Sequence, residues 1–162
     1  MGKGYNIGLK DFEIRGETMA SPSLRPNTLR RSKIVKSLRT FYFKRKEILL
    51  GFLFGSFAND RMRASSDVDI GILFKAIPDI EAINDLTEEL SSIFQRRVDL
   101  SILNHASPVL KMQILKNGIL LYASKRKHFH HFFTDTVNQY DDLKQIRKNC
   151  EENILKGRIY AR

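Results

Sequence analysis

The spacing of hydrophobic residues predicts an alternation of helices and strands over most of the chain. In residues 32–46, apolar side chains recur at helical spacing, at Ile34, Val35, Leu38, Phe41 and Tyr42. The apolar run of residues 48–54 predicts a buried strand that stops at Gly55. In residues 68–74, Val, Ile and Phe alternate with Asp and Gly, which predicts a second strand with two unlike faces.

Turn and cap residues mark the elements around these strands. We expect a short helix over residues 56–63 and a polar turn at 64–66, between the two strands. Pro78-Asp79 begins a helix that Arg96-Arg97 ends, with an apolar stripe at Ile80, Ile83, Leu86, Leu90 and Ile93. Residues 98–103 then predict a third strand.

The C-terminal third adds two helical patterns and a strand. Ser107-Pro108, a cap followed by proline, begins a helix that Asn117-Gly118 closes, and a short strand follows at 119–122. Residues 124–160 keep helical spacing, either as one long helix or as a pair. The pattern as a whole predicts an α/β (α+β) fold, in which helices flank a small mixed sheet and the C-terminus is helical.

Length and composition fit one domain of 162 residues, 42% of them hydrophobic. We expect a poorly organised leader at 1–27, with Met19 as an alternative start, a core at 28–123 and a helical extension of the same domain at 124–162. No apolar run is long enough to span a bilayer, and no signal peptide is visible. With Cys150 as its single cysteine, the sequence reads as a cytoplasmic protein.

The net charge of +10 is unevenly distributed along the chain. Lys and Arg number 12 against 3 Asp and Glu in residues 1–46, 5 against 10 in 47–104, and 11 against 5 in 105–162. An acidic centre between two basic flanks suits a metal site whose surroundings attract an anion such as a triphosphate, a nucleic acid or an acidic protein. A basic tail with solvated helix faces is the alternative explanation.

Gly55-Ser56 is a candidate phosphate-binding turn. A strand that ends in glycine and continues into a helix presents free backbone N–H groups at a helix N-terminus, where phosphate is attracted. Glycine permits close approach of the phosphate, and the Ser56 hydroxyl can donate to one of its oxygens. The dipeptide alone carries little information, because any tight turn accommodates it.

Three aspartates supply a candidate metal site. Asp67 and Asp69 are two residues apart on the second strand and therefore point to one face, which Asp99 on the third strand can share. Carboxylates beside a bound triphosphate select Mg²⁺, so these residues are the parts of a two-metal phosphoryl- or nucleotidyl-transfer site. Asp99 is then a metal ligand or the general base. The alternatives are a turn or capping role for Asp67 and an ion pair of Asp99 with Arg96 or Arg97.

These residues resemble a known signature. Gly55-Ser56, ten intervening residues and Asp67-Val68-Asp69 match the pattern of the polymerase-β-like nucleotidyltransferase superfamily. Val98-Asp99-Leu100, the segment 114–122 and the aromatic C-terminal helix extend the resemblance to the minimal nucleotidyltransferases, the MntA-type antitoxins of type VII (HEPN/MNT) toxin–antitoxin systems.

The resemblance implies a fold, a reaction and a partner. The fold is the polymerase-β-like nucleotidyltransferase fold, and the reaction is ATP- and Mg²⁺-dependent transfer of AMP to a tyrosine of a HEPN-domain RNase toxin. Gly55 and Ser56 would bind the triphosphate, Asp67 and Asp69 the metal, and Asp99 would complete the catalytic triad. Ser66 and Arg61 join the nucleotide site, with Arg61 or Arg63 replacing an arginine that the family carries directly after the alanine.

Other interpretations remain open. A non-catalytic antitoxin would neutralise its toxin by binding alone, and a related enzyme would modify a small hydroxylated acceptor such as an aminoglycoside. The C-terminal aromatic residues can form either core or a partner surface; core is the prediction. A metal site at His128, His130 and His131, a catalytic role for the loop residue His105, and RNA binding by residues 30–46 are all less favoured.

Overall fold

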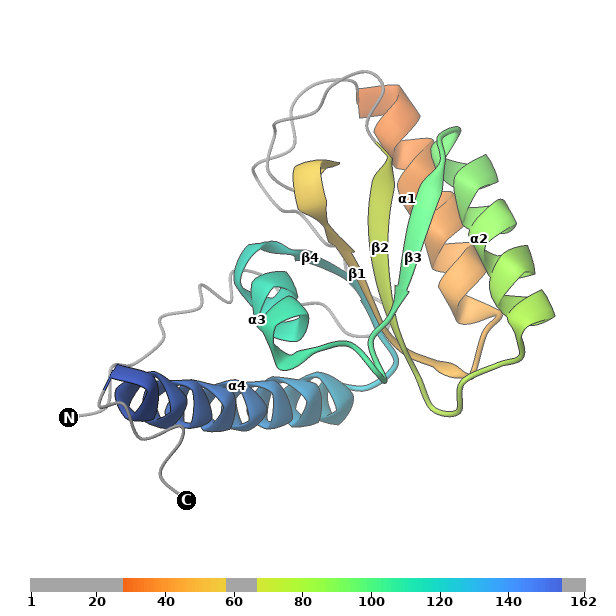
Figure 1. Ribbon diagram of the computed structural model, residues 1–162. Helices are drawn as coiled ribbons and strands as arrows, with labels where there is room; N and C mark the ends of the chain where they lie inside the picture. The colour runs from red at the N-terminus through yellow and green to blue at the C-terminus, as the bar shows by residue number, and fades with distance from the viewer. Residues whose placement is uncertain (1–27, 58–66, 156–162) are drawn as a thin grey trace.

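The computed structural model describes residues 28–57 and 67–155, which form a four-stranded mixed sheet covered by helices on both faces (Figure 1). The strands are β1 Ile48–Phe54, β2 Val68–Phe74, β3 Val98–Ile102 and β4 Ile119–Ala123. Their order across the sheet is β3-β2-β1-β4. β1 is antiparallel to β2 and β4, whereas β2 and β3 are parallel. The predicted fold class is therefore confirmed.

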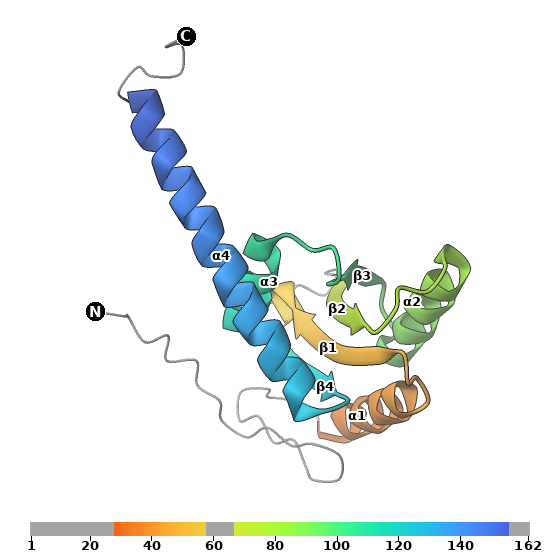
Figure 2. The same ribbon diagram turned by 90° about the horizontal axis from the view of Figure 1, so that it is seen from below.

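Two helices lie on each face of the sheet. The helical segments are α1 Thr28–Phe43, the 3₁₀ turn η1 Gly55–Phe57, α2 Ile80–Phe94, α3 Pro108–Asn117 and α4 Arg126–Leu155. α1 and α2 pack on one face, and α3 and the first half of α4 pack on the other (Figure 1). The C-terminal pattern is thus one helix rather than a pair, and its second half extends beyond the sheet (Figure 2).

Each face has its own hydrophobic core. The first core lies beneath α1 and α2 and includes Val68, Ile70 and Val98 from the strands. The second core lies beneath α3 and α4, where Phe129 and Phe132 pack against Phe52 of β1. The aromatic residues at the start of α4 are therefore core residues, as the sequence predicted.

Several predicted helix boundaries differ from the structure. α1 spans 28–43 rather than 32–46, because the chain turns after Phe43 to start β1, with the Arg45 N–H donating to the Tyr42 carbonyl at 3.1 Å. α2 ends at Phe94, before the Arg96-Arg97 pair, because Gln95 adopts a left-handed conformation with φ of 53°. Of the helix expected over 56–63, only the 3₁₀ turn at 55–57 lies in the described part of the chain.

Two residues that the sequence placed at helix starts, Asp79 and the predicted cap Ser107, are N-caps in the structure. The Asp79 carboxylate accepts from the Ala82 N–H at 2.8 Å at the start of α2, and the Ser107 hydroxyl accepts from the Leu110 N–H at 3.2 Å at the start of α3. The leader expected over residues 1–27 lies outside the described residues. Within the described segments, no helix has both the length and the hydropathy needed to cross a membrane.

Asn104 fixes the far end of the β2–β3 pair, a role that the sequence did not suggest. Its side-chain amide accepts from the Phe74 N–H at 3.0 Å and donates to the Phe74 carbonyl at 2.9 Å. The amide thus pairs with the last residue of β2 as a further strand residue would. Because β2 and β3 carry the candidate carboxylates, this clamp helps to fix their relative register.

Candidate active site

Two of the predicted aspartates are register partners on neighbouring strands. Asp69 of β2 is opposite Asp99 of β3, directly after the pair Val68 and Val98. Both valines are buried in the first core, so the alternation of side chains places both aspartates on the opposite face, the α3–α4 side. Asp67 precedes Val68 and belongs to the same side as Asp69. The sheet therefore brings the three carboxylates to one end of one face.

Gly55 joins the candidate phosphate-binding turn to these carboxylates. Phe54, the last residue of β1, is the register partner of Asp69, and Gly55 follows with a left-handed φ of 71°. A Cβ built on Gly55 would lie 2.7 Å from the Asp69 Cγ and would overlap the carboxylate. The position thus requires glycine for its backbone conformation and for the close approach of Asp69. Ser56 follows in η1, half-buried.

The three carboxylates repel one another. Partial burial raises the pKa of Asp69 above its ordinary value, and the charges of Asp99 and Asp67 raise it further. Asp69 is half-buried, whereas Asp67 and Asp99 are exposed. The side-chain hydrogen bonds and ion pairs found within the described segments involve neither Asp67 nor Asp99, so the capping and ion-pair alternatives gain no support. A cation between the carboxylates would offset this repulsion.

The donor set fits Mg²⁺ that is held jointly with a nucleotide. Within the described residues, no three His, Cys, Asp or Glu side chains already converge as a metal cage. Mg²⁺ sites of this kind use one or two carboxylates and complete the octahedron with phosphate oxygens and water, so a ready-made cage is not required. Asp69 and one neighbouring aspartate supply the one or two carboxylates that such a site uses.

The remaining candidates are placed as follows. Arg61, Arg63 and Ser66 lie outside the described residues. His105 is exposed in the loop between β3 and α3. This loop follows the C-terminal end of β3, whereas Asp99 lies at the N-terminal end of that strand. The His128 Nδ1 lies 2.7 Å from the Ser124 hydroxyl, a local contact at the start of α4.

Arg97, which the sequence suggested only as an ion-pair partner of Asp99, lies level with Asp67. Its carbonyl accepts from the Val68 N–H at 2.9 Å, directly before Val98, the register partner of Val68, so the same register sets Arg97 beside Asp67. Its place beside Asp67 depends on the pairing of β2 with β3, so the sequence alone carries no local signal for it.

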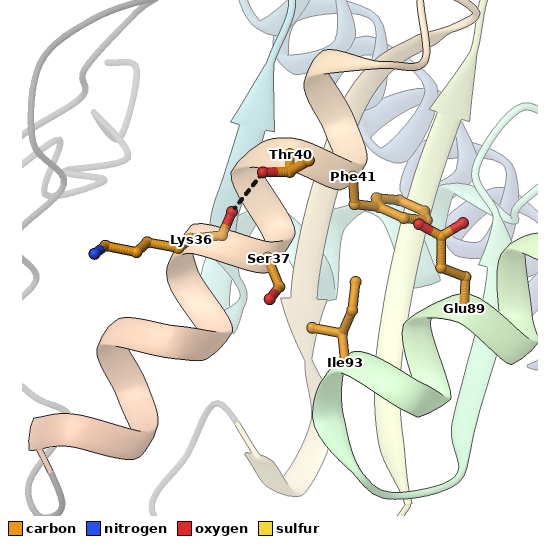
Figure 3. A pocket seen from close by; sticks show the side chains of 6 residues that line it. All are labelled: Lys36, Ser37, Thr40, Phe41, Glu89 and Ile93. Atoms are coloured by element: carbon orange, nitrogen blue, oxygen red, sulfur yellow. Dashed lines mark hydrogen bonds between the residues drawn. The ribbon is translucent and has the colours of Figure 1, made fainter.

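A pocket found elsewhere does not belong to this site. It lies between α1 and α2, with Lys36 and Thr40 on one side and Glu89 and Ile93 on the other (Figure 3). Phe41, a residue of the first core, forms part of its lining. The pocket is therefore on the helical layer that covers the opposite face of the sheet from the carboxylates.

Comparison with known proteins agrees with this geometry. The protein family described as "Polymerase beta, Nucleotidyltransferase" matches residues 36–127, from α1 to the start of α4. The protein adenylyltransferase MntA of Shewanella oneidensis is 30% identical over 127 residues, which are 78% of this chain and 88% of that protein.

Solved toxin–antitoxin structures have the same fold. A chain from a toxin–antitoxin crystal structure with AMP-PNP is 29% identical, with a TM-score of 0.62 over 78% of this chain and 99% of the other. A chain from a tri-AMPylated HEPN toxin in complex with its MNT antitoxin, from Shewanella oneidensis, is 28% identical, with a TM-score of 0.58 over 79% and 98%. The chain belongs to the polymerase-β-type nucleotidyltransferase family.

Proposed function

We propose that this nucleotidyltransferase is an Mg²⁺-dependent adenylyltransferase that transfers AMP from ATP to a tyrosine of a partner HEPN toxin in the cytoplasm and so neutralises it. The observation that carries the proposal is the contact of Gly55 with Asp69, together with the register pairing of Asp69 and Asp99. These two relationships unite a phosphate-binding turn and a carboxylate cluster at one end of one face of the sheet.

The residues have distinct roles in the proposed reaction. Backbone N–H groups at Gly55-Ser56 and the Ser56 hydroxyl bind the triphosphate, and Ser66 and Arg61 contribute to the same nucleotide site. Asp67 and Asp69 hold Mg²⁺, which when bound neutralises charge on the phosphates. Asp99 lies on the edge strand, where an acceptor can approach, and serves as a ligand of a second Mg²⁺ or as the base that takes the acceptor proton.

The reaction balances without a further reagent. The acceptor oxygen forms a bond to the α-phosphorus of ATP, the bond to the bridging oxygen breaks, and pyrophosphate leaves. The hydroxyl proton passes to Asp99 or to solvent. Burial and the negative charges of Asp99 and Asp67 raise the pKa of Asp69, and a metal–triphosphate complex would offset this repulsion by bringing positive charge to the cluster.

The relatives support the choice of nucleotide and acceptor. The similar protein from Shewanella oneidensis is named a protein adenylyltransferase, and a similar toxin–antitoxin structure was determined with AMP-PNP. Another similar chain comes from the structure of a tri-AMPylated HEPN toxin in complex with an MNT antitoxin. We extend the adenylyl donor and the HEPN acceptor from these proteins to this chain.

A transfer assay tests the proposal. The chain is incubated with Mg²⁺, ATP labelled on the α-phosphate, and the HEPN protein encoded beside it; we expect label on the HEPN protein, and mass spectrometry to place it on tyrosine. EDTA and the double variant Asp67→Asn/Asp69→Asn should abolish labelling. Asp85→Asn, which removes an exposed carboxylate of α2, is the matched control and should label normally.

Two outcomes would favour the other interpretations. If the double variant still neutralises the toxin in cells and in an RNase assay, neutralisation occurs by binding and the catalytic proposal fails. If label moves to an aminoglycoside and not to the HEPN protein, the acceptor assignment fails, although nucleotidyl transfer stands.

A further inference from the structure

Arg97 lies at the edge of the carboxylate cluster. It is the last residue of the turn between α2 and β3, and the hydrogen bond from the Val68 N–H to its carbonyl places it level with Asp67. Val98, the next residue, is buried in the first core. Because side chains alternate along an extended chain, Arg97 and Asp99 belong to the same side, opposite Val98.

The Arg97 side chain is exposed, and in the described part of the chain it forms neither a side-chain hydrogen bond nor an ion pair. Its neighbour Arg96, by contrast, is half-buried and engaged in an interaction. A guanidinium carries five N–H donors in a planar fork that matches carboxylate and phosphate groups. Arg97 therefore presents this fork next to the site without a structural partner among the described residues.

The strand order separates Arg97 from the phosphate-binding turn. Gly55 and Ser56 follow β1, whereas Arg97 precedes β3, and β2 with Asp69 lies between these strands. Neighbouring strands are about 4.8 Å apart, so the turn and Arg97 flank the carboxylates from opposite sides. A triphosphate at Gly55-Ser56 leaves the β3 side, next to Asp99, for the acceptor hydroxyl.

We propose that Arg97 binds an anionic group of the acceptor, next to the hydroxyl that receives the nucleotide. This inference rests on the proposed function and adds to it a residue that selects the acceptor. The anion is a carboxylate or a phosphate, taken by the guanidinium fork. A carboxylate would come from an acidic side chain near the acceptor tyrosine, and a phosphate from an AMP already attached to the acceptor.

Steady-state kinetics of Arg97→Ala test the proposal. With saturating ATP and the HEPN protein as the varied acceptor, we expect the KM for the acceptor to rise at least about tenfold, the loss typical of a charge-assisted hydrogen bond. The KM for ATP should remain within about twofold of wild type. Arg97→Lys should recover part of the loss, because it restores the charge but not the fork.

Arg96→Ala is the matched control, since it removes the same charge one residue away on the other side of the chain.

Two changes to the acceptor protein distinguish a bound carboxylate from a bound phosphate. Neutralising the acidic residues around the acceptor tyrosine should remove the difference between wild type and Arg97→Ala if a carboxylate is bound. A defect confined to transfer onto an acceptor that already carries AMP identifies the phosphate instead.

Other results would overturn the inference. A raised KM for ATP with an unchanged KM for the acceptor would assign Arg97 to nucleotide binding. An equal rise in the acceptor KM in Arg96→Ala would show that both arginines act only through their positive charge, without a specific contact. If wild type transfers no AMP at all, the proposed function fails. The dissociation constant of the HEPN protein for wild type and Arg97→Ala then decides the inference separately, and equal values would refute it.

Discussion

Gly55 and the Asp69 carboxylate are packed against each other at the end of β1, with no room for a Cβ between them. The turn proposed to bind phosphate and the carboxylate proposed to bind metal are therefore parts of one contact. A side chain added at Gly55 must displace the Asp69 carboxylate, while the Asp69 backbone is held by its pairing with Phe54 and Asp99. This contact explains why glycine stands at the start of the signature, at a fixed distance along the sequence from Asp67 and Asp69.

Gly55→Ala should impair both folding stability and activity. The left-handed φ of 71° costs a non-glycine residue about 1–2 kcal/mol, and overlap with the Asp69 carboxylate adds to this. We expect a lower urea midpoint and a loss of AMP transfer of at least about tenfold, because the proposed metal ligand and the proposed phosphate-binding turn shift together.

The same substitution in an Asp69→Ala background separates the two causes. Without the carboxylate the overlap disappears, so Gly55→Ala should cost less there than in wild type, and the difference is the coupling energy. Equal costs in the two backgrounds would show that backbone strain alone requires the glycine.

Asp69→Asn should stabilise the metal-free protein at neutral pH while it abolishes transfer. The pKa of Asp69 is raised by burial and by Asp99 and Asp67, so the folded state keeps its proton at pH values where the unfolded state has lost it. Stability due to this group is therefore present at low pH and decreases as pH rises from the ordinary aspartate value through the raised one.

Thermal unfolding measured across this pH range in EDTA checks the prediction. Wild type should lose stability with rising pH more steeply than Asp69→Asn, and added Mg²⁺ with a non-hydrolysable ATP analogue should raise the melting temperature of wild type only. A melting temperature of Asp69→Asn below that of wild type in EDTA would mean that the carboxylate is stabilised in the folded state.

The sequence predicted all four strands of the described sheet because their signals are local. The apolar run of β1 and the alternation in β2 each depend on side-chain burial within seven residues. The period of a strand also placed Asp67 and Asp69 on one face, which Asp99 on the next strand was able to share. The register that sets Asp69 opposite Asp99, and the contact of Gly55 with Asp69, depend on pairing between distant segments.

The features that the sequence missed have no local signature. The left-handed Gln95 ends α2 before the arginines, and an asparagine that clamps Phe74 across the sheet resembles any other loop asparagine. Arg97 was visible as a charge, but its relation to Asp67 required the β2–β3 ladder.

Tyr42→Phe should leave the protein as stable as wild type or more stable. The Tyr42 hydroxyl is buried without a hydrogen-bond partner among the described residues, and burial raises its pKa. An unsatisfied buried hydroxyl costs about 1–3 kcal/mol, whereas the ring keeps its stacking on Tyr122 at 4.9 Å after the substitution. Urea unfolding measures the difference.

Gly51→Ala should have the opposite effect on stability, because Gly51 lies against the Tyr42 ring. A Cβ there would lie 2.6 Å from the Tyr42 Cζ, so the ring must move and stability should fall by about 1–3 kcal/mol in both the wild-type and the Tyr42→Phe backgrounds. A clear loss of stability in Tyr42→Phe itself would show that the hydroxyl has a partner.

His128 should make the start of α4 sensitive to acid. Burial lowers its pKa, and the charges of Lys127, Lys125 and His131 lower it further, so protonation is less favourable in the folded state than in the unfolded one. Its contribution to stability is therefore fully present above the ordinary imidazole value of about 6.5 and is lost as pH falls through the lowered value. His128→Gln should reduce the slope of melting temperature against pH between pH 7 and about pH 5.

Ser124→Ala removes the 2.7 Å contact to Nδ1 but leaves the lysines, so it should lower stability at pH 7 and keep an acid-dependent slope. A slope that is unchanged in His128→Gln would assign the acid sensitivity to other groups.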